Sequence, residues 1–219
     1  MKELVMRFCM LAVGIVVMAA GIVVVTESKT GTSPISSTGY VLSCAFTSVS
    51  YGVFMFVWNM LLLLLQLVIL RKRFKALALL QIPISVLFSL SVDFFTHLLS
   101  AFSPANYAIS VLVLLCGIAL LAFGVALTVV ANVAMNCAEA LVAAITLKTG
   151  WNFGYTKVGF DVFCVVLAAF VSLATMQSII GIREGTLVAA CATGFIVNAI
   201  VKLFGGVKPA LAKKSNGSF

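Results

Sequence analysis

Apolar residues dominate six long runs of this chain, which polar or charged connections separate. The runs cover approximately residues 7–26, 52–70, 76–100, 105–130, 158–180 and 186–204. A helix rises about 1.5 Å per residue, so about 20 residues cross the roughly 30 Å hydrocarbon core of a membrane. The pattern therefore predicts an all-α fold, a polytopic transmembrane helix bundle with six spans.

Two shorter segments, about 34–49 and 136–150, do not fit the six-span pattern. A helix of either length reaches only about 20–25 Å, which is less than the hydrocarbon core. Irregular backbone at membrane depth must be covered by protein or must line a water-filled cavity. We therefore expect two short helices that are either re-entrant or interfacial.

The composition agrees with a membrane location. With 63% hydrophobic and 9% charged residues, the chain has too few charged side chains to cover a soluble domain. Its 219 residues suit a single domain, 1–219, in a lipid bilayer. The net charge is +8, but the basic residues lie in the connections and are not interleaved with aromatic residues, so we expect no nucleic-acid partner.

The basic connections also predict the orientation. The cluster RKRFK (71–75) follows the second run, Lys148 and Lys157 precede the fifth, and further lysines lie in the tail, 205–219. Cytoplasmic connections of membrane proteins are enriched in Lys and Arg. Six spans with both termini in the cytoplasm place all of these connections, and the tail, on the cytoplasmic side.

The two halves of the chain, 7–100 and 105–204, resemble each other. The stretch GIVVMAAGIVVV, from Gly14, aligns with GIALLAFGVALT, from Gly117, and the two short segments then align in order. Chance similarity among common apolar residues is the alternative. Because three spans is an odd number, the second repeat would insert upside down, as in the inverted repeats of many secondary transporters.

In inverted-repeat transporters, interrupted segments at matching positions mark the binding site. The stretch GTSPISSTG (31–39) contains such a start, because Pro34 suits a first helical turn and Ser33 or Thr32 suits its cap. Helix starts attract anions and polar solutes. The candidate substrate-binding residues are Ser33, Ser36, Ser37, Trp58, Asn59, Asn136, Glu139, Asp161 and Thr186.

Three acidic residues, Asp93, Glu139 and Asp161, are candidate ion-coupling residues, because ionisable groups inside a membrane are costly and mark functional sites. They would carry a proton or bind Na⁺. The alternative is that such polar groups form hydrogen bonds between helices. The motifs HExxH, GxSxG and GxxxxGK[ST] do not occur, so we expect no enzyme, no catalytic residue, no metal and no cofactor.

Several of these features resemble a known family. They are an Arg before the first span, G-x6-G within it, the turn T-G-x-x-P (30–34), the RKRFK connection and a late G-T pair (Gly185 and Thr186). In these features the chain resembles the YczE/YitT-like integral membrane proteins of bacteria. The resemblance implies a multi-pass protein of the bacterial cytoplasmic membrane with suspected transport activity. The second half departs from it, because NVAMNCAEA replaces a Gly-Pro turn.

The sequence thus predicts a secondary transporter of a small polar or anionic solute, with a midplane site at the repeat interface. Two alternatives stay open. One is the substrate-binding subunit of an energy-coupling uptake complex, and the other is a membrane scaffold or sensor that transports nothing. A homodimer is compatible with each of these, and the solute, its direction of movement and the coupling ion are open.

Overall fold

The computed structural model describes residues 2–71 and 76–203, and this part of the chain is all-helical. The helices are α1 (Lys2–Glu27), α2 (Pro34–Ala45), α3 (Tyr51–Leu70), the 3₁₀ helix η2 (Ala76–Leu80), α4 (Gln81–Leu98), α5 (Tyr107–Ala131), α6 (Cys137–Thr149), α7 (Phe153–Met176) and α8 (Glu184–Leu203). Six of these helices, α1, α3, α4, α5, α7 and α8, are long and apolar enough to cross a membrane. The predicted six-span helical fold is confirmed. The tail, 205–219, and most of the RKRFK cluster lie outside the described residues.

The fifth span differs from its predicted bounds of 158–180. Helix α7 begins at Phe153, where the Asn152 side chain accepts a hydrogen bond from the Gly154 N–H, 2.9 Å away. Lys157, predicted to lie in a connection, is therefore inside the helix. It tolerates this position because Asp161, one turn later, neutralises its charge at 2.6 Å.

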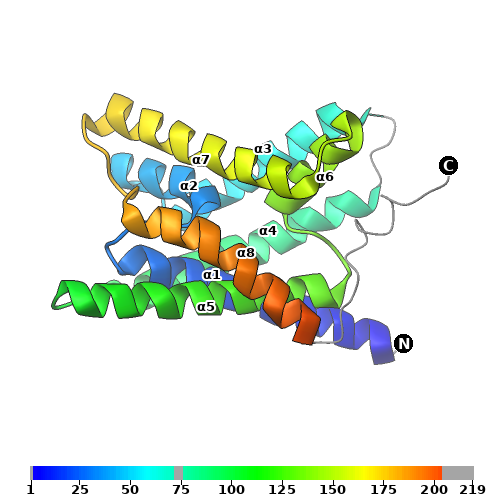
Figure 1. Ribbon diagram of the computed structural model, residues 1–219, viewed down its shortest axis with the longest axis horizontal. Helices are drawn as coiled ribbons and strands as arrows, with labels where there is room; N and C mark the ends of the chain where they lie inside the picture. Colours follow the sequence, from blue (N-terminus) through cyan, green and yellow to red (C-terminus); the bar gives the residue numbers. More distant parts are fainter. Residues whose placement is uncertain (1, 72–75, 204–219) are drawn as a thin grey trace.

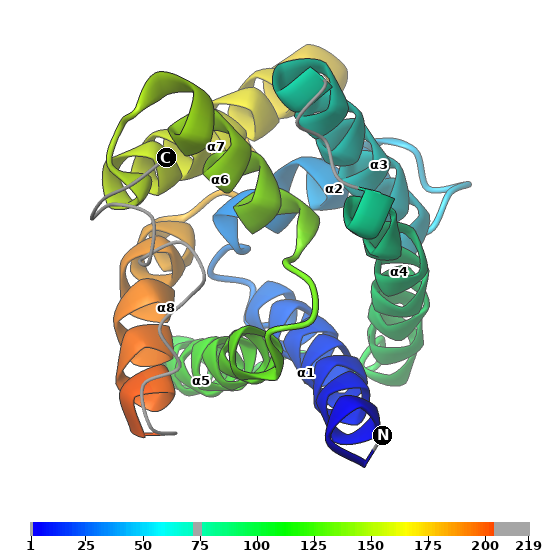
Figure 2. The same cartoon turned by 90° about the vertical axis from the view of Figure 1, so that its right-hand side faces the viewer.

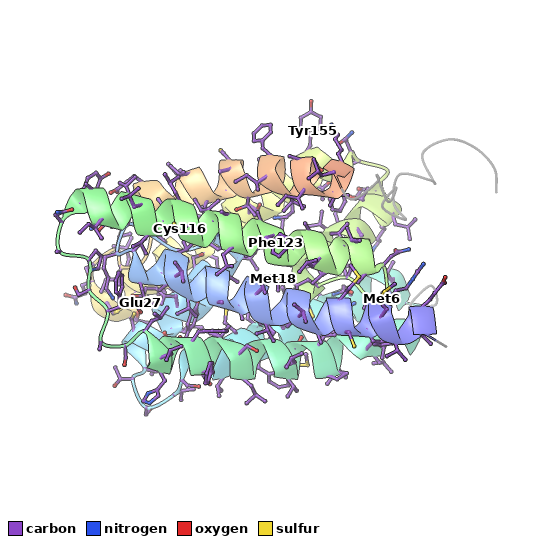
Figure 3. All side chains as sticks on the ribbon, turned by 90° about the horizontal axis from the view of Figure 1, so that it is seen from below. Met6, Met18, Glu27, Cys116, Phe123 and Tyr155 are labelled. Atoms are coloured by element: carbon purple, nitrogen blue, oxygen red, sulfur yellow. The ribbon has the colours of Figure 1, made fainter. Side chains whose placement is uncertain are left out.

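The closest helix pair joins the two halves of the chain. Helices α1 and α5 pack antiparallel along their lengths, and α4 and α8 flank this pair on α1 and α5 respectively. Figure 3 shows α1 between α5 and α4. Glycines permit the close approach, since a Cβ atom added at Gly21 would overlap the backbone of Leu121.

The two short helices start inside the bundle. Figure 1 shows α2 running from the middle of the molecule towards the end where α1 finishes, while α6 runs towards the opposite end. Figure 2, which looks along the bundle, shows the six long helices around them. Pro34 and Cys137, the first residues of α2 and α6, are both buried. Both short helices therefore begin in the interior of the bundle.

Candidate functional site

The loop before α2 returns to the middle of the bundle and is anchored to the start of α8. The Thr32 N–H donates to Thr186 Oγ1 at 3.1 Å, and the Gly185 N–H donates to the Thr30 carbonyl at 2.9 Å. Gly31, at φ 146°, lies so close to Thr186 that an added Cβ atom would lie 2.6 Å from Thr186 Oγ1. Thr186, a predicted site residue, is therefore at the start of α2.

Hydroxyl side chains fill this region. The buried hydroxyl residues are Thr26, Ser28, Thr30, Thr32, Ser33, Ser36, Ser37 and Thr38. Most of these hydroxyls donate to nearby carbonyls, as Ser36 does to Ser33 at 3.1 Å and Ser37 to Pro34 at 2.6 Å. Buried polar groups must be paired in this way when water is excluded. Ser36 and Ser37 thus have internal partners at the predicted site.

Ser33 is different, because it stands at the N-cap position of α2 without capping it. Its backbone is extended (φ −66°, ψ 141°), but its side chain makes no capping hydrogen bond. The N-cap side chains Ser50, Asn106 and Asn152 each accept a bond from the first turn of their helices. The predicted cap at Ser33 is therefore not formed, and the start of α2 keeps unused donor capacity.

Helix α3 runs antiparallel to α2 and brings two predicted site residues to it. Gly39 packs against Met55, and the rings of Tyr40 and Tyr51 lie 5.7 Å apart in an edge-on arrangement. Continuing this register by one helical turn places Trp58 and Asn59 beside the first turn of α2. Both are buried, with exposed fractions of 8% and 3%.

The start of α6 is held by two glutamines from neighbouring helices. Gln66 of α3 and Gln81 of α4 exchange two amide hydrogen bonds of 3.1 Å each. Gln66 Nε2 also donates to the Cys137 carbonyl at 3.0 Å. Asn136, a predicted site residue, accepts from the Cys137 N–H at 2.8 Å, so it caps α6. These contacts fix where α6 begins.

Two of the three predicted ion-coupling residues, Glu139 and Asp161, lie on the neighbouring helices α6 and α7. Lys157 Nζ contacts both carboxylate oxygens of Asp161 at 2.6 Å, and the Asp161 side chain is only 15% exposed. Asp161 is therefore paired with a lysine that the sequence pattern places in a connection. Glu139, in the first turn of α6, makes no ion pair among the described residues.

Asp93, the third predicted ion-coupling residue, lies elsewhere. Its carboxylate accepts from the Gly52 N–H at 2.6 Å and from the Ser50 hydroxyl at 2.7 Å, at the start of α3. A carboxylate at this position stabilises a helix start. The structure thus gives Asp93 a structural partner and does not bring it to Glu139 and Asp161.

A cavity of about 260 Å³ lies away from these groups. Its lining residues are Val24, Glu27, Leu99, Phe102, Leu112, Val113 and Cys116, from α1, α5 and the connection between α4 and α5. Figure 3 shows Glu27 and Cys116 near one end of the molecule. This cavity is apolar in lining and does not coincide with the predicted midplane site.

The fold and the buried polar groups define a multi-pass α-helical membrane protein with two short interior helices. The chain belongs to a family of unknown function, DUF6198, whose pattern matches residues 5–202. It is 30% identical over 197 residues to the uncharacterized membrane protein YczE of Bacillus subtilis (strain 168), a match that covers 90% of this chain and 86% of the relative. The predicted YczE-like resemblance is confirmed. No solved structure matches the chain.

Proposed function

We propose that this protein is a secondary transporter of a small polar or anionic solute, with its binding site where α2 and α6 begin. The observation that carries the proposal is the course of these two helices, which start inside the bundle and run to opposite ends (Figure 1). Secondary transporters build their midplane sites from such interrupted helices at matching positions of two repeats. The sites bind solutes through helix ends and buried polar groups.

Contacts between α1 and α5 support an inverted repeat. A shift of 103 residues converts Met18 into Leu121 and Gly21 into Gly124. A Cβ atom added at Gly21 would overlap the Leu121 backbone, and one added at Gly124 would overlap the Met18 backbone. These two close approaches exchange under the shift, as expected for a two-fold axis between antiparallel halves.

A second pair of contacts obeys the same shift. It converts Gly14 into Gly117 and Val25 into Thr128. A Cβ atom at Gly14 would lie 3.0 Å from Thr128 Cγ2, and one at Gly117 would lie 2.7 Å from the Val25 nitrogen. Both pairs belong to one antiparallel register of α1 on α5, so they count as a single observation, and the support for duplication comes from the glycines that coincide under the shift.

The halves also differ in a way that suits alternating access. Helix α4 packs against both α1 and α3, whereas its counterpart α8 packs against α5 but scarcely touches α7. Rocking of one bundle against the other opens the site to each side in turn. We infer that a second state exchanges the two arrangements, with α8 on α7 and α4 away from α3.

The charged cluster is the proposed coupling site. Asp161 has Lys157 as an internal counter-ion, while Glu139 makes no hydrogen bond or ion pair among the described residues. A carboxylate without a close partner in this position is suited to bind a proton or Na⁺ during transport. The coupling ion is therefore assigned to Glu139 and Asp161, with Lys157 holding Asp161 in place.

The test is flux in liposomes that contain the purified protein. Solute uptake should require a proton or sodium gradient, and Glu139→Gln with Asp161→Asn should abolish the gradient dependence. Glu3→Gln with Glu184→Gln removes two exposed carboxylates and serves as the control, with flux unchanged. Full gradient-driven flux in the Glu139 and Asp161 double variant would refute the coupling mechanism.

A membrane scaffold that transports nothing is the second candidate. It is favoured by the internal pairing of the buried hydroxyls near α2 and by a cavity that lies elsewhere. A scaffold has no need of two conformations. Liposomes that give no flux for any tested amino acid, sulfur compound, vitamin or anion, under either gradient, would favour it over the transporter.

A further inference from the structure

Trp58 has a hydrogen-bond donor that the described protein does not use. Its side chain is 8% exposed, yet Nε1 has no hydrogen-bond partner among the described residues. A buried N–H group without a partner destabilises the folded protein. Such a cost is typically offset by a ligand or an ordered water at the site.

A second unused donor belongs to a residue that packs against the same hydrophobic cluster as Trp58. The Ile35 N–H has no acceptor in the described chain, and the Ser33 side chain leaves the helix start uncapped. Ile35 packs against the hydrophobic cluster that contains Trp58 and Cys137. The register from Gly39 on Met55 also places Trp58 beside the first turn of α2.

We propose that the Trp58 indole N–H and the uncapped start of α2 form a binding site for a small monovalent oxyanion such as a carboxylate. The inference rests on the proposed function for its place on a transport path, but binding is measurable without transport.

The chemistry of the site selects this class. Both donors present N–H groups, and the start of α2 adds the positive end of a helix dipole, so an acceptor with negative charge is preferred. A planar oxyanion offers two oxygens, one for each donor. Residues 30–45 and 51–70 contain no Lys or Arg. Lys157 of the neighbouring helix α7 is already paired with Asp161, so the site offers no free full positive charge for a multiply charged anion.

The chain offers its own fluorescent reporter. It contains two tryptophans, and Trp151 is 66% exposed, so Trp151→Phe leaves Trp58 as the only tryptophan. This variant in detergent should show a saturable emission change with sodium acetate. Acetamide, which has the same shape without the charge, and sodium chloride at matched ionic strength should give none.

Substitutions then test the donors. Trp58→Phe should weaken acetate binding at least about tenfold, measured from the acetate-dependent rise in the thermal unfolding midpoint. Trp151→Phe is the matched control and should bind as the wild type does. Ser33→Asp places a carboxylate at the cap position, so it should remove the acetate effect and raise the midpoint without acetate, whereas Ser33→Asn should raise it less.

Several results would overturn the inference. They are equal binding of acetate and acetamide, no binding of acetate, or acetate binding by Ser33→Asp equal to that of the wild type. The Ser33→Asp variant still tests the acetate site if Trp58→Phe fails to fold. Acetate binding without flux of any solute would support the binding site and refute the transporter proposal. Flux without acetate binding would support the transporter proposal and refute the binding site.

Discussion

Thr186 determines, at the scale of single residues, where the loop before α2 is held. Its hydroxyl oxygen is fully buried and accepts from the Thr32 N–H across 154 positions of sequence. Thr186→Val keeps the side-chain shape and removes the acceptor. The free energy of unfolding should fall by about 1–3 kcal/mol, because a buried N–H loses its partner.

Thr193, which lies in the same helix as Thr186, provides the control. The Thr193 hydroxyl bonds to the Ala189 carbonyl of its own helix at 2.7 Å and holds no other segment. Thr193→Val should change the free energy of unfolding by less than about 0.5 kcal/mol, measured by denaturant titration in micelles. Equal losses for the two variants would mean that the Thr32 bond does not stabilise the loop.

Sequence reasoning at this scale found residue types but not partners. Ser33, Trp58 and Thr186 were identified from composition and position, and the structure places all three around the start of α2. Lys157 was missed, because a lysine near the end of an apolar run is typical of a connection. Only its spacing of four from Asp161 indicated an ion pair on one helix face.

At the scale of elements, the glycines of α1 and α5 allow these two helices to pack closely. Gly21→Ala and Gly124→Ala each place a methyl group against the backbone of the opposite helix. Overpacking of this kind costs about 1–3 kcal/mol, so both variants should unfold at lower denaturant concentration. Two such losses of similar size are expected, because the contacts are reciprocal.

Glycines on α7 and α8 serve as the control. An added Cβ atom at Gly159 or Gly194 meets no atom within 4 Å. Alanine at either position should leave the free energy of unfolding unchanged or raise it by up to about 1 kcal/mol, through better helix propensity. Destabilisation equal to that of Gly21→Ala would show that close packing is not the reason for the glycines.

Element boundaries were predictable where apolar runs alone decide them. The six runs correspond to six helices, but α7 starts five residues earlier than expected, at Phe153. The reason is local, since the Asn152 cap and the Lys157–Asp161 pair extend the helix through polar sequence. The short length of the segments near 34 and 136 predicted that they do not span, while their inward course required the structure.

The orientation of the whole molecule in the membrane is a prediction from charge. The α4–α5 and α6–α7 connections lie at opposite ends of the molecule (Figure 1). In a chain without its native cysteines, Ser103→Cys should react with a membrane-impermeant maleimide in intact cells. Thr149→Cys should react only after permeabilisation, because both termini are predicted to be cytoplasmic. The opposite pattern would reverse the assigned orientation.

The difference between the halves leads to a prediction about motion. Helix α3 packs on α4, but α7 does not pack on α8, although a strict repeat would give both pairs the same contact. Sequence patterns cannot reveal this difference, because each half shows the same order of three apolar runs and one short segment. Spin labels on exposed residues of α7 and α8 (Phe170 and Leu187) and of α3 and α4 (Leu64 and Leu90) report both pairs.

If the transporter proposal holds, the distance distribution of each labelled pair contains two populations. Acetate, sodium and pH, varied singly in nanodiscs, should shift the two pairs in opposite directions, the α7–α8 distance shortening as the α3–α4 distance lengthens. A ligand shifts such an equilibrium only when it binds the two states unequally. The component that shifts the distances therefore identifies the species coupled to the motion. One unchanging distance for each pair under every condition would contradict alternating access and favour a rigid scaffold.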